Sequence, residues 1–126
     1  MLDKETLVAF MATSRPDAAR AFFEGGLGLT FVGEHEHLVM FRCGAAELML
    51  QKVPVVRPPH GTALGWNVKD LRGTMRALVE RGVTFERFEG MDQDEMGVWS
   101  PGPGTGVAWF KDPDGNLLSL SGTGQD

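Results

Sequence analysis

The sequence of 126 residues is poor in cysteine, in basic residues and in long apolar runs. Its single cysteine, Cys43, cannot form an internal disulfide, so we expect a protein of a reducing, cytoplasmic compartment. Lys and Arg number 12 against 17 Asp and Glu, and this net charge of −5 argues against a nucleic-acid partner. No apolar run approaches the roughly 20 residues that span a membrane, so we expect no membrane partner.

What the sequence does contain is typical of one globular domain, which we expect over residues 1–126. Hydrophobic residues make up 42% and charged residues 23%, an ordinary balance that provides enough apolar surface for a core. The 17 glycines indicate many turns between short strands.

The first half of the chain has a strand, a helix and three strands in order. Thr13 or Ser14 can cap a helix over residues 18–24, Pro16 suits its first turn, and Gly25 and Gly26 end it. Alternating or continuous apolar stretches predict the strands, at residues 7–12, 29–34, 38–43 and 47–53.

A linker rich in proline, residues 54–61, separates this half from a second one with the same order of elements. Asp70 can cap a helix that runs to about Arg81 and ends at Gly82. The predicted strands of this half are residues 63–68, 83–86, 98–99, 107–110 and 117–120.

The two halves also align as a degenerate repeat. An offset of 54 places Gly28 on Gly82 and Phe31 on Phe85, and an offset of 70 places Leu48 on Leu118. The offset grows because the second copy carries an extra loop near residues 90–104. We therefore predict an α+β fold of two tandem β-α-β-β-β units, residues 7–53 and 62–121, whose curved mixed sheets surround a cleft.

On these residues the chain resembles the vicinal oxygen chelate superfamily, which includes glyoxalase I, bleomycin-resistance proteins and extradiol dioxygenases. The resemblance covers residues 7–121 and rests on the tandem pattern, on the 18–23 helix with the Gly-Leu-Gly-Leu that follows it, and on the Asp-Pro-Asp-Gly-Asn turn at residues 112–116. It implies the fold and a ligand cleft. The enzymes of this group hold one divalent metal at four symmetric strand positions, so the resemblance also implies such positions here.

Carried onto this chain, the four metal positions fall on Val8, Met49, Ala63 and Ser119. None of these side chains is a usual ligand for such an ion. A two-residue slip brings in Glu47 or Gln51, which is one ligand at most. We therefore expect no metal and no cofactor.

Other candidate groups have plainer interpretations. His35 and His37 could converge on a metal from one strand face, but we expect an exposed hairpin tip. Cys43 is expected to be a small core residue near a strand end. Asp92, Asp94 and Glu95 are expected in a solvated loop that can act as a lid over the cleft.

Strand parity then selects the residues that face the cleft. If Leu48 and Leu50 pack under the helix, their neighbours point to the other face, and Trp99 and Trp109 add aromatic walls. The predicted ligand-binding residues are Val8, Phe10, Glu47, Met49, Gln51, Ala63, Asn67, Trp99, Trp109 and Ser119.

A mainly apolar cleft of this kind suits a small-molecule ligand. We expect a metal-free protein that binds a small, largely apolar or aromatic molecule, as antibiotic-sequestering members of the group do. The alternatives are a divalent-metal lyase or dioxygenase of the same fold and a metal-free enzyme that uses Glu47 or the Asp94–Glu95 loop; the sequence does not decide whether there is catalysis. The resemblance also implies a homodimer, since members of this group of this size usually pair, and an apolar groove between copies fits that.

Overall fold

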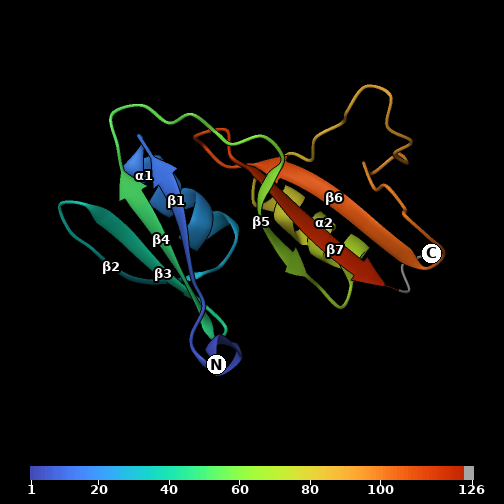
Figure 1. The fold of residues 1–126 in the computed structure, drawn as a ribbon. Coiled ribbons are helices and arrows are strands. Elements are labelled where there is room, and N and C mark those ends of the chain that lie inside the picture. The colour runs from blue at the N-terminus through green and yellow to red at the C-terminus, as the bar shows by residue number, and fades with distance from the viewer. Residues whose placement is uncertain (124–126) are drawn as a thin grey trace. The chain divides into compact units, whose positions relative to one another are not determined.

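A computed structural model describes residues 1–123 of the chain (Figure 1). The chain divides into two compact units, Met1–Arg57 and Pro58–Asp126, and each is described by itself. The division falls within the proline-rich stretch at residues 54–61. No helix in residues 1–123 is long and apolar enough to cross a membrane.

The first unit is a four-stranded sheet with the order β1-β4-β3-β2. β1 and β4 are parallel, and the other pairs are antiparallel. The elements are η1 (Leu2–Lys4), β1 (Val8–Thr13), α1 (Pro16–Arg20), η2 (Ala21–Gly26), β2 (Thr30–Glu34), β3 (Leu38–Cys43) and β4 (Ala46–Lys52).

The helix of this unit begins differently from the sequence-based expectation. Its N-cap residue is Arg15 and no side chain caps it, because the hydroxyl of Thr13 instead accepts a hydrogen bond from the Arg15 N–H, at 3.1 Å. From Ala21 the helix widens into the π turn η2, in which the Leu27 N–H reaches the Phe22 carbonyl at 2.8 Å. Gly25 and Gly26 lie inside this turn, so the helix ends two residues later than expected, and Gly28, with a φ of 78°, follows its end.

Strand parity places the core of the first unit as predicted. Leu48 and Leu50 are buried on the helix side of β4, together with Phe41 of β3 and Phe23 of η2, whose rings lie 5.6 Å apart. Met49 between the two leucines is only half-buried, since it points to the opposite face. Each fully buried large side chain contributes about 1.5–3 kcal/mol through apolar burial.

The second unit is a three-stranded sheet with the order β5-β7-β6, in which β5 and β7 are parallel. Its helix starts as predicted, because the Asp70 carboxylate accepts the Gly73 N–H at 3.1 Å. The helix side of the sheet buries Leu71 and Met75 against Phe110 and Leu118. The elements are β5 (Thr62–Asn67), α2 (Leu71–Glu80), β6 (Thr105–Lys111) and β7 (Leu117–Thr123).

Two strands expected in the second unit, at residues 83–86 and 98–99, are reduced to isolated bridges. Phe85 pairs with Phe110 and Trp99 pairs with Val107, both on the edge strand β6. The segment between them leaves the sheet, and within it the Gln93 side chain donates a hydrogen bond to the Glu86 carbonyl at 3.1 Å. The prediction of regular strands there was therefore wrong.

The bridge at Phe85 nevertheless repeats a feature of the first unit. Phe31 of β2 pairs with Phe41 of β3, and their rings meet at 72° with centroids 6.0 Å apart. Phe85 and Phe110 meet at the same angle with centroids 5.6 Å apart. The fold is thus α+β, with two mixed sheets built from βαβββ-like modules, as the sequence predicted.

Candidate functional site

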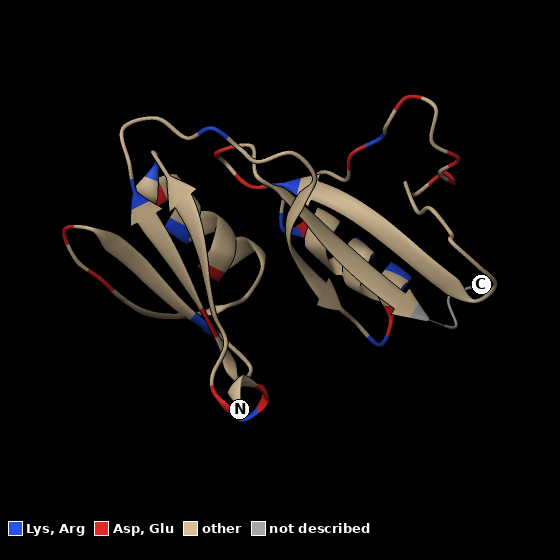
Figure 2. Cartoon of the chain, in the orientation of Figure 1, with Lys and Arg blue, Asp and Glu red and all other residues tan. Residues whose placement is uncertain are grey.

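Each sheet has an open face, which we define as the face opposite its helix. Figure 2 shows that charged residues lie mainly in the turns, on the helices and in the segment after α2, with few along the strands. Most of the predicted site residues lie on the open faces.

The open face of the first unit has an apolar centre. The register pairs Val8 with Glu47, Phe10 with Met49, and Ala12 with Gln51. Phe10 is 58% exposed, an unusual state for a phenylalanine in the middle of a strand. Together, the exposed Phe10 and Val8 and the half-buried Met49 make an apolar patch of the kind that binds ligands or partners.

Two further members of this face were missed by the sequence analysis. β3 pairs Met40 with Met49 and Leu38 with Gln51, so both side chains extend the apolar patch. At its end, Arg42 stands beside Glu47 in the same register. The alternation within β3 was the signal that could have identified these residues.

The open face of the second unit is polar along β5 and β7. Gly65 pairs with Ser119 and Asn67 with Ser121. A Cβ at Gly65 would lie 2.5 Å from the Ser119 hydroxyl oxygen, so a larger residue here would require the Ser119 side chain to move. The next strand, β6, brings Trp109 beside Ser119.

Ala63 does not occupy the paired position expected of it. The register slips between Thr62, which pairs with Leu117, and Leu64, which pairs with Leu118. Ala63 is the extra residue of this bulge, whereas its expected counterpart Val8 lies in regular pairing with Glu47. The start of β5 therefore lacks the regular pairing that Val8 has at the start of β1.

Two aromatic side chains, Phe88 and Trp99, lie against Trp109, and these three residues form what we call the aromatic surface. The Trp99 and Trp109 rings are 6.2 Å apart and tilted by 38°, and Phe88 meets Trp109 edge-on at 5.6 Å. The Trp109 indole N–H donates to the Thr62 hydroxyl at 3.1 Å, which fixes the ring over β5. Phe88 was not predicted, because it lies outside every regular element.

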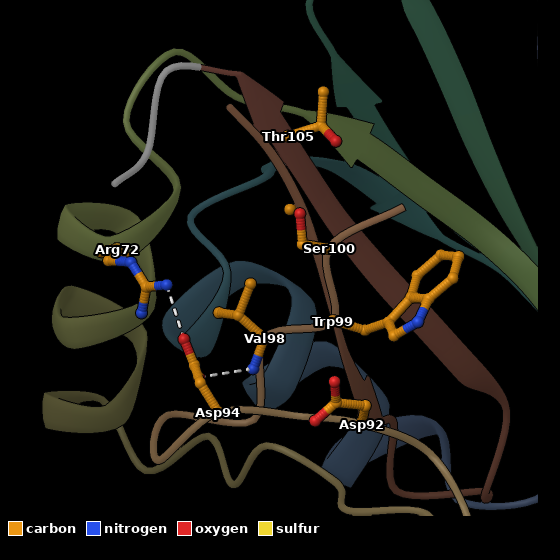
Figure 3. Close-up of a pocket in the computed structure, with 8 residues that line it drawn as sticks. Arg72, Asp92, Asp94, Val98, Trp99, Ser100 and Thr105 are labelled. Carbon is orange, nitrogen blue, oxygen red and sulfur yellow. Dashed lines mark hydrogen bonds and ion pairs between the residues drawn. The ribbon is translucent and has the colours of Figure 1, made fainter. Parts of the chain in front are cut away.

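A polar hollow of about 290 Å³ lies next to the aromatic surface (Figure 3). On one side of it Arg72 of α2 meets Asp94 at 2.6 Å, and the Trp99 ring points away from this pair. The residues that line the hollow are Arg72, Asp92, Asp94, Val98, Trp99, Ser100, Thr105 and Gly106.

Asp94 is held as a carboxylate by its neighbours. Partial burial acts to raise its pKa, but hydrogen bonds from the Val98 N–H, from Arg72 and from the Met96 N–H outweigh that effect, so the pKa is lowered. Both of its oxygens are engaged, one by two backbone N–H groups and the other by Arg72. These bonds give Asp94 a structural role and make it a poor general base.

The remaining candidates lie away from the open faces. His35 and His37 are exposed in the turn between β2 and β3, where the His37 N–H donates to the His35 Nδ1 at 3.1 Å. Cys43 is half-buried at the end of β3, where a strand-end position was expected.

The donor set does not fit the metal that the fold implies. Val8, Met49 and Ala63 offer no oxygen or nitrogen ligand, and Ser119 offers only a neutral hydroxyl. Within residues 1–123, no three His, Cys, Asp or Glu side chains are grouped so as to hold a metal ion. We derive no metal-dependent step for this chain.

The fold and the two open faces define a class of small α+β proteins built from paired βαβββ modules. The chain belongs to the Glyoxalase/Bleomycin resistance protein/Dioxygenase superfamily, whose family model matches residues 7–120. No curated protein is significantly similar to it.

Several solved structures share the fold at low sequence identity. A glyoxalase family protein from Bacillus anthracis has a TM-score of 0.75 at 16% identity, with 95% of each chain covered. TnmS3, an antibiotic binding protein from Streptomyces sp. CB03234, has a TM-score of 0.70 at 18% identity and 98% coverage of both chains. Lactoylglutathione lyase from Agrobacterium tumefaciens has a TM-score of 0.68 at 18% identity, covering 94% of this chain and 93% of that one.

Proposed function

We propose that this protein binds a small, largely apolar or aromatic molecule without a metal ion. The observation that carries the proposal is the aromatic surface of the second unit. Its two indole rings, Trp99 and Trp109, stand on an open sheet face beside neutral polar groups. Apolar walls with a few directed polar groups are typical of small-molecule sites.

The chemistry of this surface favours a planar ligand. An aromatic ring that stacks on Trp99 or Trp109 gains apolar burial and favourable ring geometry. Ser119 and Asn67, on the same face, supply hydrogen bonds that orient the ligand. The antibiotic binding described for TnmS3, a structural neighbour, supports this class of ligand.

The open face of the first unit is proposed as a second ligand-contacting surface. Phe10, Val8 and Met49 provide its apolar centre, and Glu47 and Gln51 provide polar groups at its ends. Ala63 stays among the proposed ligand-binding residues only because its small side chain leaves room for a ligand at the β5 bulge.

The proposal competes with two enzymatic functions. A divalent-metal lyase or dioxygenase is disfavoured by the donor set described above. A metal-free enzyme that uses Asp94 is disfavoured because hydrogen bonds engage both of its oxygens, and Glu47 stands beside Arg42 in the strand register.

The test combines ligand titration with elemental analysis of untagged protein. Tryptophan fluorescence should respond saturably to planar aromatic compounds such as 2-naphthol or anthraquinone-2-carboxamide, and about zero metal ions per chain should be found. One Ni²⁺, Zn²⁺, Fe²⁺ or Mn²⁺ per chain that is lost in Glu47→Gln would instead establish the metal-dependent alternative.

The homodimer stays a prediction of the sequence. Light scattering coupled to gel filtration should give twice the chain mass of 13.7 kDa. A mass of one chain at micromolar concentration would contradict it.

A further inference from the structure

The segment between the Phe85 bridge and β6, residues 86–104, carries two of the three members of the aromatic surface. In the first unit, the corresponding connection is the short turn at residues 35–37 between β2 and β3. A long segment without regular structure is ordinarily a poor support for a binding surface, because its side chains sample many positions. The contacts that hold Phe88 and Trp99 therefore determine whether the aromatic surface has a fixed shape.

Gln93 uses its whole side-chain amide inside this segment. Its Oε1 accepts the Phe88 N–H at 2.7 Å, and its Nε2 donates to the carbonyls of Glu86 at 3.1 Å and Gly97 at 2.8 Å. One acceptor and two donors account for the hydrogen bonds that a glutamine amide offers most readily. The amide thereby ties the chain just before Phe88 to the chain just before Val98.

The next residue, Asp94, completes the attachment on the Trp99 side. Its Oδ1 accepts the Met96 and Val98 N–H groups, each at 3.0 Å, and its Oδ2 accepts from Arg72 of α2 at 2.6 Å. Trp99 then exchanges two backbone hydrogen bonds with Val107, at 2.9 and 2.8 Å. The segment is thus attached to helix α2 in its middle, through Asp94, and to strand β6 on both sides, through Glu86 and Trp99.

We propose that Gln93 is the positioning residue of the aromatic surface, with Asp94 as its anchor to α2. Gln93 holds Phe88 and Trp99 against Trp109 before any ligand arrives, so the surface is preorganised and does not assemble on binding. The segment is accordingly a fixed wall of the second unit, in contrast to the lid considered from the sequence. The inference that Gln93 positions the rings depends on the hydrogen bonds described above. The inference that this positioning raises ligand affinity rests on the function proposed for the aromatic surface.

The critical variant is Gln93→Glu, which keeps the size of the side chain. It retains an acceptor for the Phe88 N–H but places a carboxylate oxygen against the carbonyls of Glu86 and Gly97, where the Nε2 donor stood. Gln93→Met, which keeps the length and removes every hydrogen bond, serves if the glutamate variant does not fold. The matched control is Glu95→Gln, two residues away, with an exposed side chain.

The first readout is circular dichroism of the ligand-free protein. Two indoles 6.2 Å apart and tilted by 38° should give an exciton couplet, identified by its loss in Trp109→Phe. The couplet should be largely lost in Gln93→Glu and Gln93→Met and kept in Glu95→Gln. A purely stabilising role for Gln93 would lower the unfolding temperature without changing the native couplet, and an unchanged couplet in both Gln93 variants overturns the proposal.

The second readout is the affinity for 2-naphthol, followed by fluorescence. We expect it to fall about five- to tenfold in the Gln93 variants and to stay within twofold in Glu95→Gln. A lost couplet with unchanged 2-naphthol affinity would leave Gln93 as the positioning residue of the rings and overturn the aromatic surface as the ligand site.

Discussion

The two units share the same order of elements but differ in the connection between their second and third strand positions. The first unit joins β2 to β3 through residues 35–37 and completes a four-stranded sheet. The second keeps the Phe85–Phe110 pairing as a single bridge and inserts residues 86–104, so its sheet has three strands. The helix-packed side is alike in both, which suggests that core packing tolerates less change than a surface connection.

The open faces of the two units also differ in whether the inserted segment contributes side chains to them. In the first unit the face is built from strands alone, with Phe10, Met40 and Met49 at its centre. Methionine is flexible, so such a face adapts to many shapes. In the second unit the inserted segment adds Phe88 and Trp99 to Trp109, and rigid aromatic rings make a more selective surface.

The largest effect is expected from truncating the equivalent core rings. Phe41→Ala and Phe110→Ala each remove a fully buried phenylalanine that meets a second ring at 72°. Each should lower the free energy of unfolding by about 3–5 kcal/mol, as measured by urea denaturation. A loss below about 1 kcal/mol at only one of them would show that the two cores are not equivalent.

The next effect concerns ligand binding at the open face of the second unit. Trp99→Ala should weaken the binding of an aromatic ligand by about 2 kcal/mol, roughly thirtyfold in affinity, because the ligand loses an aromatic wall. Ser119→Ala should cost about 1 kcal/mol, and only for a ligand that bonds to the hydroxyl. Calorimetry with the compound that a screen first returns compares these variants with the parent.

The control for this comparison is the hairpin turn of the first unit. His35→Ala and His37→Ala should leave the affinity unchanged, since both side chains are exposed away from the open faces. If either histidine variant abolishes binding while Trp99→Ala binds normally, the ligand site lies on the turn and both open faces are excluded.

A smaller effect distinguishes the two helices. Asp70→Ala removes the side-chain cap of α2 and should cost about 1 kcal/mol, whereas Asp70→Asn retains the acceptor and should cost little. α1 has no side-chain cap, so Asp17→Ala in its first turn should lose only a few tenths of a kcal/mol of dipole interaction. Thermal unfolding of the three variants measures the difference, and equal losses at both helices would contradict it.

The smallest effect is the pH dependence of two aspartates with opposite shifts. The lowered pKa of Asp94 means that its ionised form stabilises the fold above its usual pKa of 3.8, a contribution lost as the pH falls through the folded value. Asp112 is buried, and this burial raises its pKa although hydrogen bonds from Asn116 and Asp114 oppose the shift. Its contribution is present below 3.8 and is lost as the pH rises through the folded value.

Free energies of unfolding measured across the acid pH range test the directions of the Asp94 and Asp112 pKa shifts. Asp94→Asn should reduce the loss of stability on acidification, and Asp112→Asn should reduce the loss on raising the pH above 3.8. Identical pH profiles for the parent and the Asp94 variant would show that Arg72 and the two N–H groups do not favour the carboxylate.

Much of the fold could be predicted because it depends on local pattern. The alternation in β4 determined that Leu48 and Leu50 are buried and that Met49 and Gln51 point the other way. Asp70 and Gly82 marked the limits of α2 because a cap and a residue with positive φ act within a few positions along the chain.

The tertiary structure decided the parts of the site that depend on distant partners. The bulge that displaces Ala63 exists only in the pairing of β5 with β7, residues that lie far apart in the sequence. Phe88 joins Trp99 and Trp109 because the Gln93 amide satisfies backbone groups on both sides of the inserted segment. No periodicity encodes such side-chain bonds, so the sequence by itself determined the sheets and their faces, while the folded chain determined which aromatic rings meet on them.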